Sequence, residues 1–281
     1  MLRREVAAID RRLASARLPL GVESLDSALA GGLALGRVHM LCGRPGHDGA
    51  LTGFAVALLR RILAQMDEAA LVVWCPAAAG GGSGMLYAAG LSALGLDPGR
   101  LLIVDSPSPG ARLAALEDIL RTEGLAAVIV EYDRVSQTSD YWMRLARRAQ
   151  LAAEASGVTG LLLGWPVAAS GFDSLWHIAP SSAAPLSSAP SGQAGRDPSW
   201  NPSWHPCWQV ELRHARGGRP WSSQLSWDAY ANSLSEIRRE HETEAVPEPL
   251  PFAPPGPWIA SLAQGSPFIE RACLGTAGRL G

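Results

Sequence analysis

The fold of this chain is decided by residues 38–66, which read VHMLCGRPGHDGALTGFAVALLRRILAQM. An apolar run opens the segment, a glycine-rich stretch follows, and a long apolar sequence with helical spacing closes it. Strand, glycine-rich loop and helix in this order form a phosphate site in many proteins, because the loop amides and the helix N-terminus face the anion. The segment therefore raises the question of whether the protein binds a nucleotide.

The residues of this loop argue against nucleotide hydrolysis. The motif GxxxxGK[ST] needs a lysine for the β and γ phosphates and a hydroxyl for magnesium. With Gly43 and Gly49 taken as its two glycines, Ala50 and Leu51 follow instead, and Thr52 comes one place late. Losing one transition-state stabiliser costs about 10² to 10³ in rate, so the loss of several predicts a protein that is not an enzyme.

An inactive or nucleotide-free loop is the favoured interpretation, and weak nucleotide binding or a residual ATPase are the alternatives. The apolar run at residues 125–133 ends in two acids that could serve on the metal side of a nucleotide site. We expect no cofactor, no metal and no catalytic group. The residues of this degenerate site are Gly43, Arg44, Gly46, His47 and Gly49, with Glu131 and Asp133.

Beyond the loop, apolar runs alternate with helical patterns as far as residue 165. Strands are predicted at residues 70–75, 100–106, 125–133 and 158–165, and helices at residues 86–94, 111–124 and 141–157. Nearly continuous apolar strands between helices indicate an α/β fold, with a mostly parallel sheet covered on both faces. Ligands of such sheets bind at the carboxyl ends of the strands, where the glycine-rich loop lies.

The composition divides the chain into five expected segments. Residues 2–16 place apolar side chains at steps of three and four, and composition shifts to Ser, Ala and Pro after residue 165. His177 and His205 would then lie in a mobile insert. The segments are an amphipathic helix (1–17), the α/β core (18–165), a flexible loop (166–206), an antiparallel hairpin completing the sheet (207–235) and an extended proline-rich tail (236–281).

Charge and cysteine content exclude several classes of protein. The 281 residues carry a net charge of −2, and all 24 basic residues are arginine, so a nucleic-acid contact would have to be local. The four cysteines form no CxxC pair, which argues against a zinc site or a disulfide framework. Charges near the N-terminus and the lack of a long apolar segment predict a cytoplasmic protein.

Several stretches resemble RecA-type recombinases over residues 18–165. They are LPLGVESLDSALAGGLALGRVHML, the degenerate loop, GLDPGRLLIVDS and LAAVIVEYDRV. With LYAAGLSALGLDPGRLLIV, QLAAEASGVTGLLL and WQVELRHARGGRPWSSQLSWDA added, residues 18–230 resemble the ImuA family more closely. These are RecA-like proteins encoded beside ImuB and an error-prone DnaE-type polymerase, and a degenerate phosphate loop is what the resemblance leads us to expect.

The resemblance implies a RecA-like core and a non-catalytic accessory role in the SOS response, in DNA-damage-induced mutagenesis and translesion synthesis. The implied partners are an ImuB-like protein, RecA and an error-prone DnaE-type polymerase, bridged by this protein. In RecA relatives the N-terminal helix packs on a neighbouring protomer, so here it covers either its own core or another chain. Alternatives are a SulA-like inhibitor of cell division and a RecA-like protein that still binds ATP.

Two further groups are candidates for partner or DNA contact. Arg144, Arg147 and Arg148 lie on one side of a predicted helix, either as a solvated face or as a stripe that binds a partner or phosphates. Trp200 and Trp204 belong to a repeat of proline and tryptophan that cannot be helical. That segment is either a linker or, by its likeness in position to the DNA-binding loop of RecA, a surface on which bases stack.

Overall fold

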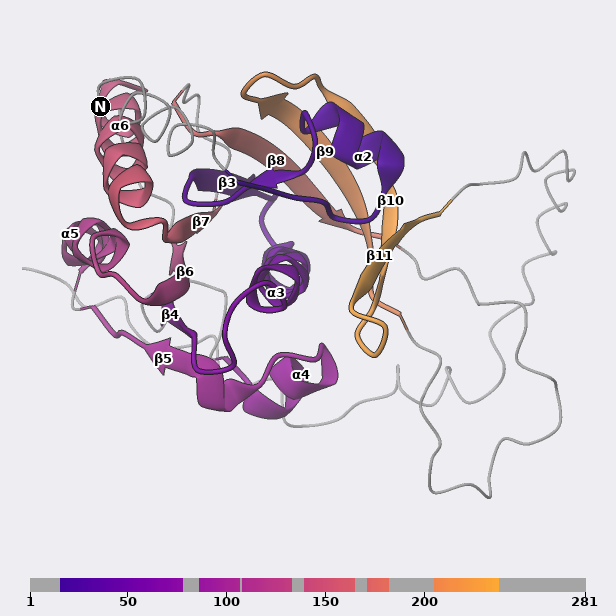
Figure 1. The fold of residues 1–281 in the computed structure, drawn as a ribbon, viewed down its shortest axis with the longest axis horizontal. Helices are drawn as coiled ribbons and strands as arrows, with labels where there is room; N and C mark the ends of the chain where they lie inside the picture. Colours follow the sequence, from indigo (N-terminus) through magenta and orange to yellow (C-terminus); the bar gives the residue numbers. More distant parts are fainter. Residues whose placement is uncertain are drawn as a thin grey trace, which may run out of the picture. The chain divides into compact units, whose positions relative to one another are not determined.

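The computed structural model describes residues 16–77, 86–106, 108–132, 139–164, 171–181 and 205–237 (Figure 1). All of them belong to a first unit, Met1–Arg238, and residues 239–281 make up a second. The amphipathic helix expected before residue 16, Asp133, Trp200, Trp204 and the tail beyond residue 237 lie outside the described residues. Arg17, expected to end that helix, instead starts the short strand β1, Arg17–Leu18, which pairs with β2, Leu33–Ala34.

The main sheet has the strand order β11-β10-β9-β8-β3-β7-β6-β4-β5. The strands from β8 to β5 in this order are parallel, and β9, β10 and β11 continue the sheet in antiparallel fashion. The expected α/β class, a mostly parallel sheet with a C-terminal antiparallel hairpin, is confirmed. The strands are β3 Val38–Cys42, β4 Leu71–Cys75, β5 Leu101–Ile103, β6 Leu125–Glu131, β7 Thr159–Gly164, β8 Ser174–Pro180, β9 Cys207–Ala215, β10 Trp221–Asp228 and β11 Ser233–Glu236.

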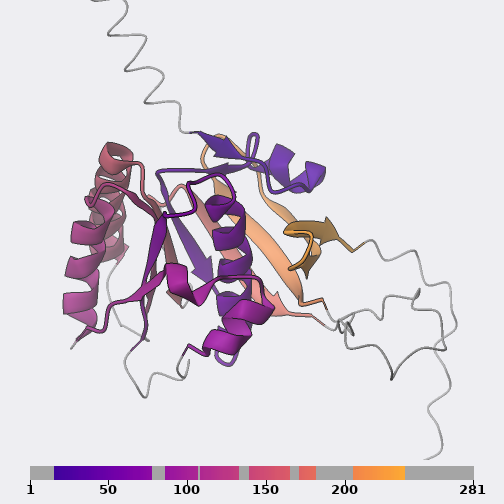
Figure 2. The same cartoon turned by 60° about the horizontal axis from the view of Figure 1, so that its bottom comes forward.

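Helices cover both faces of the parallel part of the sheet (Figures 1 and 2). Helix α3, Asp48–Leu63, packs on one face, while α5, Pro109–Leu120, and α6, Ser139–Ser156, pack on the other. Each face has its own cluster of buried apolar side chains. Shorter elements are the helices α2, Glu23–Ala28, and α4, Ala88–Ala93, and the 3₁₀ helix η1, Pro98–Arg100.

Helix α3 is buried nearly all round, because apolar residues occupy every position from residue 53 to 59. Phe54 lies between two indole rings, with centroid distances of 5.7 Å to Trp176 and 5.5 Å to Trp208. A Cβ atom added at Gly53 would lie 3.2 Å from the Trp208 ring, so the glycine allows the close approach of the helix to β9. This packing holds α3 against the sheet, directly after the glycine-rich loop.

The prediction of a flexible loop at residues 166–206 is wrong in part, because strand β8 lies within this range. This strand pairs with β3 on one side and β9 on the other, and it places Trp176 and Ile178 in the core with no exposed surface. The Ser- and Pro-rich stretch after residue 181 diluted the signal of a strand that is itself apolar on alternate residues. His177 is therefore a buried strand residue, and the hairpin gains a third strand that ends at Glu236, one residue beyond its expected limit.

Candidate functional site

The glycine-rich loop is a tight turn that begins with Gly43 and ends at the start of α3. The Gly43 amide donates to the carbonyl of Gly164 (3.1 Å), and the His47 amide donates to the carbonyl of Arg44 (3.0 Å). Gly46 has φ +83°, a conformation that suits glycine. Gly49 lies inside the first turn of α3, six positions after Gly43, whereas the two glycines of GxxxxGK[ST] are five apart. The loop therefore departs from the motif in spacing as well as in its missing lysine.

Leu51 stands in the place that a phosphate loop gives to a metal-binding hydroxyl. It is buried, and its Cδ1 atom would lie 3.1 Å from a Cβ atom added at Gly43. The side chain of His47 stands equally close to that position. The start of the loop therefore packs against the apolar side chain of Leu51 in α3.

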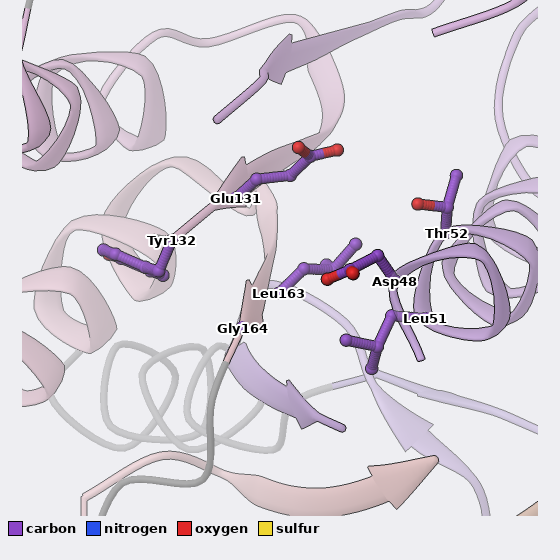
Figure 3. A pocket seen from close by; sticks show the side chains of 7 residues that line it. All are labelled: Asp48, Leu51, Thr52, Glu131, Tyr132, Leu163 and Gly164. Atoms are coloured by element: carbon purple, nitrogen blue, oxygen red, sulfur yellow. The ribbon is translucent and has the colours of Figure 1, made fainter. Parts of the chain in front are cut away.

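A small pocket opens beside this turn at the carboxyl ends of β6 and β7 (Figure 3). The space open to the centre of a water molecule is about 20 Å³, which is room for a water molecule and far less than a nucleotide needs. The lining residues are Asp48, Leu51, Thr52, Glu131, Tyr132, Leu163 and Gly164.

The charge of this pocket is unfavourable for phosphate. Figure 3 shows its two carboxylates on opposite sides, Glu131 at the end of β6 and Asp48 at the start of α3. Among the described residues, no basic side chain lines the pocket, and Arg44 is exposed on the loop. Asp48 also occupies the first turn of α3, where it already interacts with the positive end of the helix dipole.

Both carboxylate oxygens of Glu131 are engaged in hydrogen bonds inside the protein. Oε1 accepts from the indole Nε1 of Trp74 (2.9 Å), and Oε2 accepts from the amide of Ala77 (3.0 Å). The backbone carbonyl of Glu131 accepts from the buried guanidinium of Arg112 (3.0 Å). Glu131 thus joins the ends of β4 and β6, a structural role that Trp74 and Arg112 share and that their positions in the sequence did not reveal.

The three arginines of α6 are not equivalent. Arg148 forms an ion pair with Glu117 of α5 (Nη2 to Oε2, 2.7 Å), whereas Arg144 and Arg147 are exposed without an ion pair to any described residue. The opposite face of the helix packs on the sheet through buried residues that include Trp142. All three arginines of the expected stripe are exposed, but Glu117 neutralises the charge of Arg148.

His39 is part of a buried hydrogen-bond chain. Its Nε2 atom lies 2.8 Å from the carbonyl oxygen of Ala34, which can only accept, so the ring proton is on Nε2. The Ser174 hydroxyl donates to Nδ1 (2.7 Å) and accepts from the indole Nε1 of Trp176 (2.6 Å). Complete burial lowers the pKa of His39, so the ring stays neutral and ties β3 to β8.

Among the residues that the structure describes, His177 is the other buried histidine of the sheet. Burial and the nearby guanidinium of Arg213 lower the pKa of His177, which lies 4.0 Å from a carboxylate oxygen of Glu211. Among the residues that the structure describes, no three His, Cys, Asp or Glu side chains gather as they would around a metal ion. Within the same residues, no helix has both the length and the hydropathy to cross a bilayer.

Fold and site together define an α/β protein whose phosphate-loop position holds neither a lysine nor an open cradle. No protein-family model matches the chain. Two curated relatives, both named Protein ImuA and from two strains of Caulobacter vibrioides, are 34% identical to it over 224 residues. The match covers 72% of this chain and 80% of each relative. The chain belongs to the ImuA family.

Proposed function

We propose that the protein is a non-catalytic accessory protein in DNA-damage-induced mutagenesis and translesion synthesis. It acts by holding an ImuB-like protein, RecA and an error-prone DnaE-type polymerase together, so its contribution is binding free energy and position. Membership of the ImuA family supports this role. A non-catalytic role is supported by one observation: at the place for nucleotide phosphates, the described residues form a small pocket with two carboxylates and no cation.

The physical argument starts from the pocket. A triphosphate placed there would face Asp48 and Glu131 with no lysine to offset the repulsion, and Leu51 fills the loop from inside. Each carboxylate oxygen of Glu131 already accepts one hydrogen bond, from Trp74 or from Ala77, so the side chain is held as part of the pocket wall. Neither binding nor hydrolysis of a nucleotide is supported by this arrangement.

Nucleotide binding and turnover are tested on the purified full chain with magnesium and ATP. We expect no phosphate release above that of the buffer and no saturable binding of a fluorescent ATP analogue. Asp48→Asn removes one of the repelling charges without touching the Glu131 network, and Glu131→Gln removes the other. Turnover by the natural chain that either substitution abolishes would contradict the non-catalytic role.

The partners are tested by affinity purification of the tagged protein from DNA-damaged cells, in parallel with a chain lacking residues 239–281. The deletion starts there because Glu236 accepts a hydrogen bond from Ser24 (2.9 Å) and the Ile237 amide donates to Gln224 (2.9 Å). We expect an ImuB-like protein, the polymerase or RecA with the full chain and a loss with the deletion. Recovery of the division tubulin alone would favour a SulA-like inhibitor instead.

A further inference from the structure

The turn between β9 and β10 carries a dense group of basic residues. Residues 213–219 read RHARGGR, and Arg216 and Arg219 are exposed at the turn. The turn lies beside α2 in both views of the fold (Figures 1 and 2), at the amino ends of β3 and β8. It is therefore at the opposite edge of the sheet from the pocket of Asp48 and Glu131.

Two arginines from the N-terminal part of the chain join this turn. The guanidinium of Arg17 donates to the carbonyls of Leu29 (2.8 Å) and Gly32 (3.3 Å), and more weakly to that of Arg216 (3.5 Å). These neutral acceptors hold the side chain in place without cancelling its charge. Arg37 precedes β3, and burial lowers its pKa; the nearby charge of Asp173 opposes this shift, while those of Arg216 and Arg17 add to it. We name Arg17, Arg37, Arg216 and Arg219 the arginine patch.

Only two carboxylates of the described residues pair with the arginine patch. Asp173 lies 3.6 Å from the Nε atom of Arg216, and Glu154 forms an ion pair with Arg37. Asp173 is itself 4% exposed, so a ligand at the surface meets the Arg216 side chain, which is 56% exposed. The patch thus has two more arginines than paired carboxylates, on a chain whose net charge is −2.

The arginines are mounted on a rigid support. The Arg219 amide donates to the carbonyl of Ala28 at the end of α2 (2.9 Å). A Cβ atom added at Gly218 would lie 2.1 Å from that same carbonyl oxygen, so only glycine allows the turn to pack this closely. Because this packing already fixes the backbone of the turn, binding of a ligand would not have to order the loop as well as the arginine side chains.

We propose that the arginine patch binds the phosphate backbone of a nucleic acid. Guanidinium groups match phosphate oxygens in geometry and charge, and several on a rigid turn can follow successive phosphates. Protein interfaces also use arginine, but they combine it with aromatic and methionine side chains at their core. The strongly exposed large apolar side chains of the described residues lie elsewhere, just before α4, on β5, on α6 and in the β10–β11 turn. This contact does not depend on which protein partners the chain has.

The test is fluorescence anisotropy of a labelled single-stranded oligonucleotide and of its duplex, with the full chain, from 50 to 200 mM salt. The test variant is Arg216→Gln with Arg219→Gln, since both side chains are exposed at the turn and glutamine can still donate a hydrogen bond to Asp173. The control, Arg144→Gln with Arg147→Gln, removes the same charge from α6, where both arginines are exposed and neither forms an ion pair with a described residue. A third variant replaces Arg216 and Arg219 by lysine and keeps the charge.

We expect the variant with glutamine at positions 216 and 219 to bind about tenfold more weakly, as expected for the loss of two phosphate contacts. The slope of log binding constant against log salt concentration should become smaller in magnitude by about 1.4 to 1.8. The α6 variant should bind like the natural chain, and the lysine variant should keep the natural salt slope, because the slope depends on the number of charges. Equal weakening by the α6 pair would overturn the proposal, because it would show a response to net charge alone. Absence of binding at 50 mM salt, or displacement of the oligonucleotide by polyglutamate as readily as by unlabelled oligonucleotide, would also overturn it.

Discussion

Acidification should destabilise this protein through the buried imidazole of His39. Its two ring nitrogens are committed to Ser174 and Ala34, and burial lowers its pKa, so the folded chain keeps it neutral. In the unfolded chain the group titrates near 6.5. Below that pH the unfolded state therefore binds the extra proton, and stability is lost as pH falls.

The magnitude follows from this difference in proton binding. If the folded ring remains neutral, each pH unit well below 6.5 shifts the folding equilibrium tenfold toward the unfolded state. Between pH 7.5 and pH 5.0 the loss amounts to about 2 kcal/mol, out of a typical total of about 5 to 15 kcal/mol for a domain. The free energy of unfolding is measured by urea titration at the two pH values, with tryptophan fluorescence as the signal.

His39→Gln isolates the contribution of this residue, because it cannot titrate. The variant should be less stable at pH 7.5 by about 1 to 3 kcal/mol, through imperfect hydrogen bonds to its buried partners, but should lose about 2 kcal/mol less on acidification. His177→Gln is measured beside it, because the pKa of His177 is also lowered and this residue adds its own part to the loss of stability on acidification. An equal acid loss in the His39 variant and the natural chain, or an imidazole of His39 that titrates near pH 6.5 by NMR in the folded protein, would refute the reasoning.

Three further substitutions and one control test the packing described above, each by urea unfolding. Gly218→Ala should cost about 1 to 3 kcal/mol, because its Cβ would overlap the carbonyl oxygen of Ala28; an unchanged midpoint would show that the turn is not clamped on α2. Phe54→Ala, which empties the space between two indoles, should cost about 3 to 5 kcal/mol, whereas Leu151→Ala on the exposed face of α6 should change stability by less than about 0.5 kcal/mol. Glu131→Gln should cost about 1 to 3 kcal/mol by leaving one buried donor poorly paired, and a neutral effect would contradict its structural role.

Local sequence patterns were sufficient for most of the fold. Short apolar runs between segments with helical spacing predicted the mostly parallel sheet, since both faces of such a sheet are buried and most positions of its strands select an apolar residue. The loss of the lysine and the hydroxyl around Gly49 was equally visible, because the motif depends on residues that are adjacent along the chain. These features are local, and local features can be read without knowing what lies beside them.

Tertiary structure alone decided what depends on distant segments coming together. Strand β8 was hidden by the polar composition around it and exists because β3 and β9 provide hydrogen-bond partners on both sides. Glu131, which the sequence offered as an acid for a metal, is tied to Trp74 by a hydrogen bond between the ends of neighbouring strands.

The arginine patch shows the same limit. Arg17 and Arg37 are about 180 to 200 positions from Arg216 along the chain, and the sum of charges over the whole sequence conceals them. Folding places them together at the amino edge of the sheet, where the turn of β9 and β10 packs on the end of α2. The sequence by itself determined most of the elements and the absence of a lysine from the loop. The tertiary structure decided which charges meet, because electrostatic interaction depends on distance in space and not on separation along the chain.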